Sequence, residues 1–167
     1  EKFRKLKGLK LAYLGDANNN VTHSLLFALP RVGMHLTVCC PNNKEFMPNA
    51  SVVDAAKKYA KENSTKLVIS SNPDEAKGAD IVYTDSWMSY HIPKDQEARR
   101  DTALKKYQVS SKTMQHAGKN SVFMHCLPAK RGEEVTADVI DGRQSIVLDQ
   151  AENRLHMQKA ILVWLLK

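Results

Sequence analysis

The chain has 167 residues, 43% of them hydrophobic and 26% charged, a composition typical of a globular domain with a packed core. No apolar run approaches the roughly 20 residues of a membrane-spanning helix, and the charged start EKFRKLKGLK lacks the apolar core of a signal peptide, so we expect a soluble, cytoplasmic protein. The net charge of +7 suggests an anionic partner such as a nucleic acid, an acidic protein or a phosphorylated metabolite, and the lack of a nucleic-acid motif argues against the first.

Apolar runs of strand length alternate with segments of helical period along the whole chain. This alternation predicts an α/β fold, a three-layer Rossmann-like domain with a mostly parallel sheet flanked by helices. In chain order, the predicted elements are strand 9–16, helix 22–33, strand 34–40, helix 51–63, strand 65–70, short helix 71–79, strand 80–87, helix 94–107, short helix 110–118, strand 120–127, strand 144–149 and helix 151–166.

Several of these elements carry local signals at their ends. Pro30 should kink or end the first helix, Ser51 is expected to cap the second, and either Ser71 or Asn72 the third. The helix 94–107 should face solvent. The closing helix is apolar on more than one narrow stripe, so it should pack on something larger than one sheet face, such as a further domain.

The chain has three cysteines, Cys39, Cys40 and Cys126, and their odd number and spacing support neither a disulfide framework nor a zinc knuckle. We therefore expect reduced thiols. Cys39 and Cys40 end an apolar run and are expected to be packing residues. Cys126 lies between a histidine and a Leu-Pro pair and is harder to dismiss as a packing residue.

Polar stretches follow four of the predicted strands: GDANNN at 15–20, DSWMSYH at 85–91, HCLPAKRG at 125–132 and DQAENR at 149–154. Any one of them is more often a turn than a site. The carboxyl ends of parallel strands share one edge of a sheet, however, and ligands of open α/β sheets bind there. Four such stretches at one edge predict a binding site. Because GDANNN is not the G-x-G-x-x-G fingerprint, a nicotinamide cofactor is not expected.

Three side chains at this edge suit chemistry on an amine. Asp85 could pair with a substrate ammonium group, or it could cap a helix. Cys126 ends a strand beside it. Arg154 falls in the first turn of a helix, where acids are favoured, and it could bind a carbonyl or phosphate oxygen or form an ion pair with Glu152.

The stretches HCLPAKRGEEVTADVIDG and AENRLHMQKAILVWLL resemble the C-terminal signature of the transcarbamylase family, most closely its ornithine carbamoyltransferases. FMHCLP is very specific, and GD…NN…HS resembles the family's ornithine-binding turn. The resemblance covers essentially all 167 residues. It implies that residues 1–167 are the amino-acid (ornithine)-binding domain. The phosphate-gripping Ser-Thr-Arg-Thr motif of the N-terminal carbamoyl-phosphate domain is absent, and the final helix, about 151–167, should pack towards that domain.

The resemblance also implies a reaction. The side-chain amine of L-ornithine attacks the carbonyl carbon of carbamoyl phosphate and gives L-citrulline and phosphate, with no metal or organic cofactor. Asp85 would bind the amine, and Cys126 would assist its deprotonation. Full-length chains of the family would form a homotrimer, and the partners would be the two small substrates rather than nucleic acid or membrane.

Further roles carry over residue by residue. The backbone oxygens of Cys126 and Leu127, together with Arg154, would orient the carbamoyl group of carbamoyl phosphate, and His125 and Pro128 would support this turn.

For the amino-acid end of ornithine the resemblance implies Asn20, with Asn19 as the less favoured choice. Ser89 and the backbone at Tyr90 would complete the clamp around the ornithine whose amine Asp85 binds.

Two departures from the family pattern leave alternatives open. Where ornithine enzymes carry Ser-Met-Gly, this chain has Ser89, Tyr90 and His91, and histidine resists backbone angles that glycine permits. Putrescine or an acylated ornithine could then be the acceptor. Pro30 interrupts a helix that the family keeps continuous, and it has no functional explanation. A non-catalytic module that binds an amino acid is a further alternative.

Overall fold

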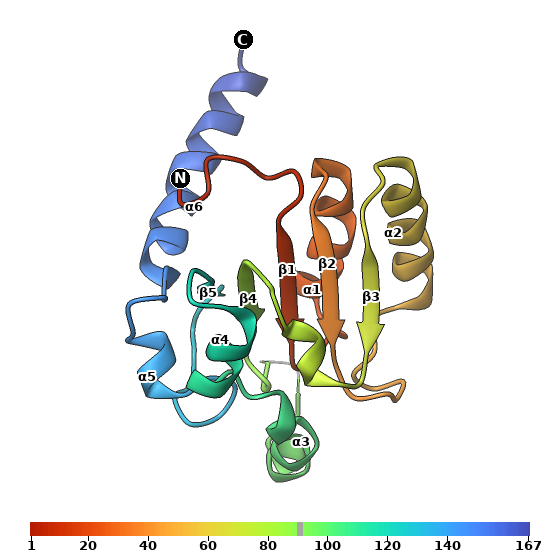
Figure 1. The fold of residues 1–167 in the computed structure, drawn as a ribbon, viewed down its shortest axis with the longest axis vertical. Coiled ribbons are helices and arrows are strands. Elements are labelled where there is room, and N and C mark those ends of the chain that lie inside the picture. Colours follow the sequence, from red (N-terminus) through yellow and green to blue (C-terminus); the bar gives the residue numbers. More distant parts are fainter. Residues whose placement is uncertain (90–91) are drawn as a thin grey trace.

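A computed structural model describes residues 1–89 and 92–167 of the chain (Figure 1). Its centre is a five-stranded sheet in the order β3-β2-β1-β4-β5, and every pairing in it is parallel. The strands are β1 (Lys10–Leu14), β2 (His35–Cys39), β3 (Leu67–Ser70), β4 (Ile81–Thr84) and β5 (Val122–His125). The predicted α/β class and parallel sheet are confirmed.

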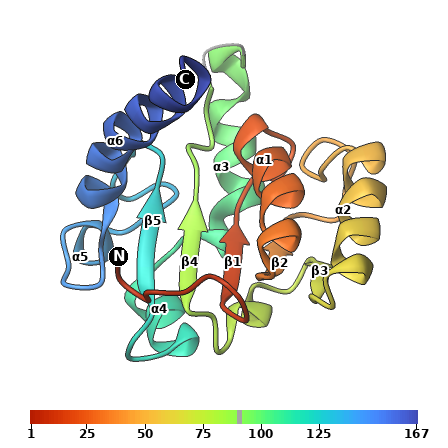
Figure 2. The ribbon, with the colours of Figure 1, turned by 90° about the horizontal axis from the view of Figure 1, so that it is seen from above.

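Helices cover both faces of the sheet, and Figures 1 and 2 show the three layers. One buried cluster joins the sheet to α1 and α2 through Leu26 and Ala56, and a second joins its other face to α3, α4 and α5 through Leu104, Met114 and Val139. The α-helices are α1 (Asn20–Ala28), α2 (Ala50–Glu62), α3 (Glu97–Leu104), α4 (Ser111–Ala117), α5 (Ala137–Ile140) and α6 (Val147–Leu165). Short 3-10 turns are η1 (Pro30–Val32), η2 (Pro73–Ala76), η3 (Lys94–Gln96) and η4 (Lys105–Tyr107).

The strand order places a switch in chain direction between β1 and β4. From β1 the chain winds outward through β2 to β3, and from β4 it winds the other way to β5. In open α/β sheets the crevice at the carboxyl ends of the two strands beside such a switch is the ligand site. The loops after β1, β4 and β5 meet at this place.

The predicted sixth strand, 144–149, is wrong. Only Ser145 forms a bridge to Phe123, and α6 already begins at Val147. A run of only three apolar residues, Ile146 to Leu148, has no period that separates a buried strand from the first turn of a helix. The polar stretch at 149–154 therefore lies within α6 rather than after a strand.

Local signals at helix ends were predicted with mixed success. Asn49, not Ser51, caps α2, because its side chain accepts the Ser51 N–H. The expected cap at Asn72 is confirmed, and α1 ends before Pro30 as expected. The predicted solvent-facing helix 94–107 is broken into η3, α3 and η4 and has buried positions. No helix in the described part of the chain is long and apolar enough to cross a bilayer.

Candidate active site

The loops after β4 and β5 are held together by side chains at the carboxyl edge of the sheet. The Thr84 hydroxyl donates to the Leu14 carbonyl at 2.7 Å, which joins the ends of β4 and β1. The Ser86 hydroxyl donates to the Pro128 carbonyl at 2.8 Å and joins the loop after β4 to the turn after β5. Asp85 and Cys126, predicted from the sequence as neighbours, lie between these two ties.

Asp85 and Cys126 are in direct contact. The Cys126 thiol donates to Asp85 Oδ1 at 2.9 Å, and the Ser86 N–H donates to the same oxygen at 2.8 Å. Cys126 as a whole residue is exposed, but its thiol is partly buried. This burial, and to a smaller extent the hydrogen bond to the Asp85 carboxylate, raises the thiol pKa to about 12. At neutral pH the thiol is therefore protonated, and it donates its hydrogen bond to the Asp85 carboxylate.

His125 shapes the turn that carries Cys126. Its imidazole is fully buried, its Nδ1 accepts the Leu127 N–H at 2.8 Å, and its Nε2 lies 3.3 Å from Oε1 of the equally buried Glu134. Because Nδ1 accepts, Nε2 is the nitrogen left to carry the ring proton, and it lies beside the Glu134 carboxylate without a hydrogen bond to the described residues. Glu134 in turn accepts the Lys130 N–H at 2.6 Å. Leu127, with φ of 60° and a cis bond to Pro128, is thus anchored from both sides.

Asn19 and Asn20 have different surroundings. Asn19 caps α1: its Oδ1 accepts the Thr22 N–H at 2.8 Å, and its Nδ2 donates to the Tyr13 hydroxyl and the Asp16 carbonyl. Both donors of this amide are in use. Asn20 is the first residue of α1, is exposed, and has no hydrogen bond from its side chain in the described structure. Its amide is the freer of the two for a ligand.

The remaining predicted residues are not all placed at the carboxyl edge of the sheet. Ser89 is half-buried in the loop after β4, and Tyr90 lies outside the described residues. Arg154 is exposed on α6, and within the described residues it has no ion pair, with Glu152 or any other residue. Gln150, one turn earlier on α6, does reach the site, since it accepts the His125 N–H and donates to the Tyr83 hydroxyl.

Sequence reasoning missed a buried ion pair beside these loops. Asp16, after β1, pairs with Arg100 of α3, and both side chains are almost fully buried. Burial raises the pKa of the Asp16 carboxyl, and the Asn18 N–H and the Arg100 guanidinium oppose the rise. The one available signal was that Arg100 lies four residues before the apolar Leu104, on the same face of the helix.

One group of side chains among the described residues could coordinate a metal ion. Ligand atoms of Asp85, His125 and Cys126 all lie within 4.8 Å of one another. A cation there would compete with the Leu127 N–H for His125 Nδ1 and would have to displace the thiol proton of Cys126. The expectation of a site without metal rests on the family resemblance alone.

Comparison with known proteins identifies the group to which the chain belongs. The family model "Aspartate/ornithine carbamoyltransferase, Asp/Orn binding domain" matches residues 7–165. Ornithine carbamoyltransferase from Hyperthermus butylicus is 48% identical over 99% of this chain and 52% of its own length. That from Methanobrevibacter smithii is 48% identical over 100% of this chain and 54% of its own length.

A solved structure agrees with these relatives. Ornithine carbamoyltransferase from Pyrococcus furiosus superposes with a TM-score of 0.89 and 42% identity, over 96% of this chain and 50% of that one. The chain thus spans about half the length of the relatives it matches. It belongs to the aspartate/ornithine carbamoyltransferase family, as a member of that family's Asp/Orn binding domain.

Proposed function

We propose that this chain supplies the ornithine-binding half of an enzyme that transfers the carbamoyl group of carbamoyl phosphate to L-ornithine. The products are L-citrulline and phosphate. The observation that carries the proposal is the contact between Asp85, in the loop after β4, and Cys126, in the His-Cys-Leu-Pro turn after β5, next to the switch point between β1 and β4. The consistent name of the relatives supports the same reaction.

The chemistry is set by the protonation states at this contact. Ornithine arrives with a charged side-chain ammonium, which the Asp85 carboxylate attracts, and only the neutral amine is a nucleophile. After the amine loses a proton to Asp85 or to solvent, its nitrogen forms a bond to the carbamoyl carbon, and the bond from that carbon to the phosphate oxygen breaks. Cys126 holds Asp85 in place as a hydrogen-bond donor, because a thiol with a pKa of about 12 is not a base at neutral pH.

The amino-acid end of ornithine would lie against Asn20 and Ser89, with the backbone at Tyr90 closing over it. The carbamoyl group would lie against the backbone oxygens of Cys126 and Leu127. Their positions depend on the His125 and Glu134 pair and on the turn at Pro128.

Arg154 would add positive charge where negative charge develops on the carbamoyl oxygen. It lies one helical turn beyond Gln150 and therefore on nearly the same face of α6. Gln150 contacts the ends of β4 and β5, so this face of the helix borders the proposed site.

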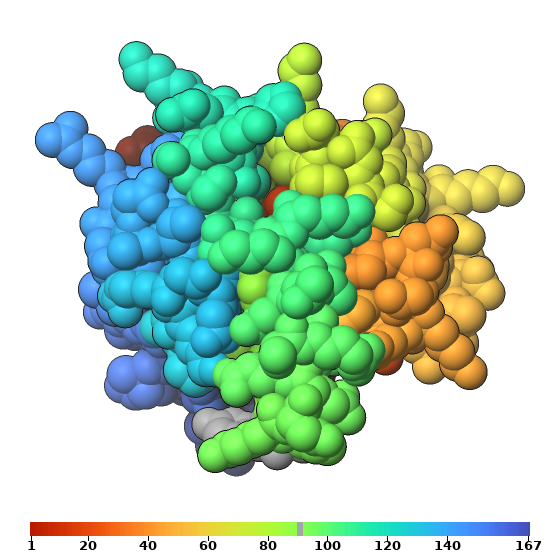
Figure 3. Space-filling model, turned by 90° about the horizontal axis from the view of Figure 1, so that it is seen from below, coloured from red at the N-terminus to blue at the C-terminus, as the bar shows by residue number. Residues whose placement is uncertain are grey.

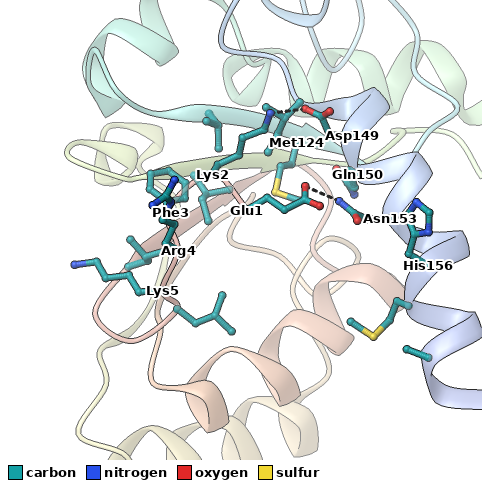
Figure 4. Close-up of a pocket in the computed structure, with 17 residues that line it drawn as sticks. Glu1, Lys2, Phe3, Arg4, Lys5, Met124, Asp149, Gln150, Asn153 and His156 are labelled. Atoms are coloured by element: carbon teal, nitrogen blue, oxygen red, sulfur yellow. Dashed lines mark hydrogen bonds and ion pairs between the residues drawn. The ribbon is translucent and has the colours of Figure 1, made fainter. Parts of the chain in front are cut away.

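A second domain would supply the grip on the phosphate and cover α6. Apolar side chains along this helix are exposed over half or more of their surface, which is uncommon for a surface helix. They include Leu155, Met157, Leu162, Val163, Trp164 and Leu165. A hollow of about 580 Å³ separates α6 from the first residues, bridged by the Lys2–Asp149 ion pair and by Asn153, which donates to Glu1 (Figure 4).

We propose that the carbamoyl-phosphate domain packs over this surface, and that the complete protein is a cytoplasmic homotrimer that uses no cofactor. We call the longest natural chain that contains these residues the parent protein.

The experiment is carbamoyl transfer by the parent protein after Asp85→Asn, which keeps the shape of the side chain and removes its charge. We expect kcat to fall by about two orders of magnitude or more with an unchanged melting temperature. Asp95→Asn, at an exposed carboxylate of η3, is the matched control and should stay within about twofold of the wild type. Near-normal turnover in Asp85→Asn would contradict the proposal.

A further inference from the structure

Arg100 is a buried cation on α3, on the same face of the helix as the buried Leu104. Its side chain is 5% exposed, whereas that of its neighbour Arg99 is 58% exposed. A guanidinium group is costly to bury unless each of its faces and donors finds a partner. The partners of Arg100 therefore show what the burial achieves.

Those partners come from three different loops. Arg100 Nε donates to the Trp87 carbonyl at 2.9 Å, in the loop after β4. One terminal nitrogen pairs with Asp16, after β1, and the other donates to Glu45 Oε1 at 3.2 Å, after β2. The guanidinium carbon also lies 4.9 Å from the centre of the Phe46 ring.

The space-filling view shows the surface above these contacts, at the carboxyl edge of the sheet (Figure 3). The segment that contains α3, in green, lies between the orange segment that follows β2 and the cyan segment that follows β5 (Figure 3). We call Arg100, Asp16, Glu45 and the Trp87 carbonyl the arginine clamp.

The arginine clamp joins the two loops that would hold opposite ends of ornithine. Asp16 also accepts the Asn18 N–H at 2.8 Å, so the clamp fixes the turn that leads into Asn20. At its other side it fixes the backbone at Trp87, two residues from both Asp85 and Ser89. A change in the clamp would shift these two loops relative to each other.

We propose that Arg100 is a positioning residue that sets the distance between Asn20 and the Asp85–Ser89 segment, and so the side-chain length of the diamino acid that the site accepts. The inference rests on the proposed function, because it takes Asn20 and Asp85 as the two ends of the ornithine site. The planar fork of arginine bonds three partners at fixed angles, and the single ammonium of lysine cannot reproduce this geometry.

The test compares acceptors that differ by one methylene: L-2,4-diaminobutyrate, L-ornithine and L-lysine. In the parent protein, Arg100→Lys should change the ratio of kcat/KM for ornithine to that for lysine by about tenfold or more. The KM for carbamoyl phosphate should stay within about twofold, since no described member of the clamp hydrogen-bonds directly to the Leu127 turn. Arg99→Lys, at the exposed neighbour that shares Glu45, is the matched control and should leave both quantities within about twofold.

A folded Arg100→Lys protein with an unchanged ratio of kcat/KM for ornithine to that for lysine would overturn the inference. This holds whatever stability the variant loses, because a purely structural role does not alter selectivity for side-chain length. If Arg100→Lys does not fold, Glu45→Gln decides in the same way, since the Glu45 side chain is 33% exposed and its substitution should cost less stability. A wild-type protein without carbamoyl transfer to any of the three acceptors would instead contradict the proposed function.

Discussion

At the scale of single residues, the contact between Asp85 and Cys126 keeps the Cys126 thiol protonated. Because burial and the carboxylate raise the Cys126 pKa to about 12 from an ordinary 9.0, the fraction of thiolate at pH 8 is lower by roughly a thousandfold. Cys39 and Cys40 are buried, so Cys126 is the accessible thiol of the described residues.

We expect iodoacetamide to alkylate Cys126 of the parent protein slowly at pH 8, and the rate to rise with pH beyond 10 without levelling near 9. Asp85→Asn removes the negative charge that opposes ionisation and should accelerate the reaction by about tenfold or more. Mass spectrometry of the peptide that contains Cys126 measures the rate. A profile that levels near pH 9, or no effect of Asp85→Asn, would contradict the assignment of Asp85 as the acceptor of the thiol hydrogen bond.

At the scale of secondary-structure elements, the N-terminus of α1 carries two asparagines with different proposed roles. Asn19 caps the helix, and Asn20 is proposed to bind the substrate. Asn19→Ala removes the helix cap and two further hydrogen bonds and should lower the free energy of unfolding by about 1 to 2 kcal/mol. Asn20→Ala should change it by less than about 0.5 kcal/mol, because the side chain is exposed and makes no hydrogen bond with the described residues.

Kinetics should show a complementary pattern in the parent protein. Asn20→Ala should raise the KM for ornithine by about tenfold, since a hydrogen bond to the charged amino-acid end is lost. Urea unfolding and steady-state kinetics on both variants measure the two effects. Equal KM values for the wild type and Asn20→Ala would exclude Asn20 from the ornithine site.

Elements of this fold were predictable from sequence where one local signal determined them. Each strand of the sheet is a short apolar run that ends in a polar turn, and Asp85 and Cys126 were found because they directly follow such runs. The segment 144–149 was misassigned because its few apolar residues fit a strand and a helix equally well. Asp16 and Arg100 are 84 residues apart, and only the folded chain brings them together. Glu134 was missed for the same reason, because its structural role depends on its contacts with His125 and with the Lys130 N–H in the folded chain.

At the scale of the whole molecule, α6 carries the exposed apolar surface that the proposed carbamoyl-phosphate domain would cover. Trp164 is 76% exposed, whereas the only other tryptophan, Trp87, is buried. In the 167-residue chain, acrylamide should quench Trp164 fluorescence efficiently, and in the parent protein a covering domain should protect it. Comparison with Trp164→Phe identifies the part of the fluorescence that comes from Trp164. Equal quenching of Trp164 in the two proteins would show that no domain covers this part of α6.

The central claim is that ornithine is the acceptor at the carboxyl edge of this sheet. The most direct measurement is steady-state carbamoyl transfer from carbamoyl phosphate by the parent protein, with L-ornithine, putrescine and N-acetyl-L-ornithine as competing acceptors. We predict citrulline formation with a kcat/KM for ornithine about a hundredfold or more above the other two, because the polar groups around Asn20 would be left unpaired by putrescine and blocked by the acyl group. Equal or faster transfer to putrescine or N-acetylornithine, or no transfer to ornithine, would contradict the claim.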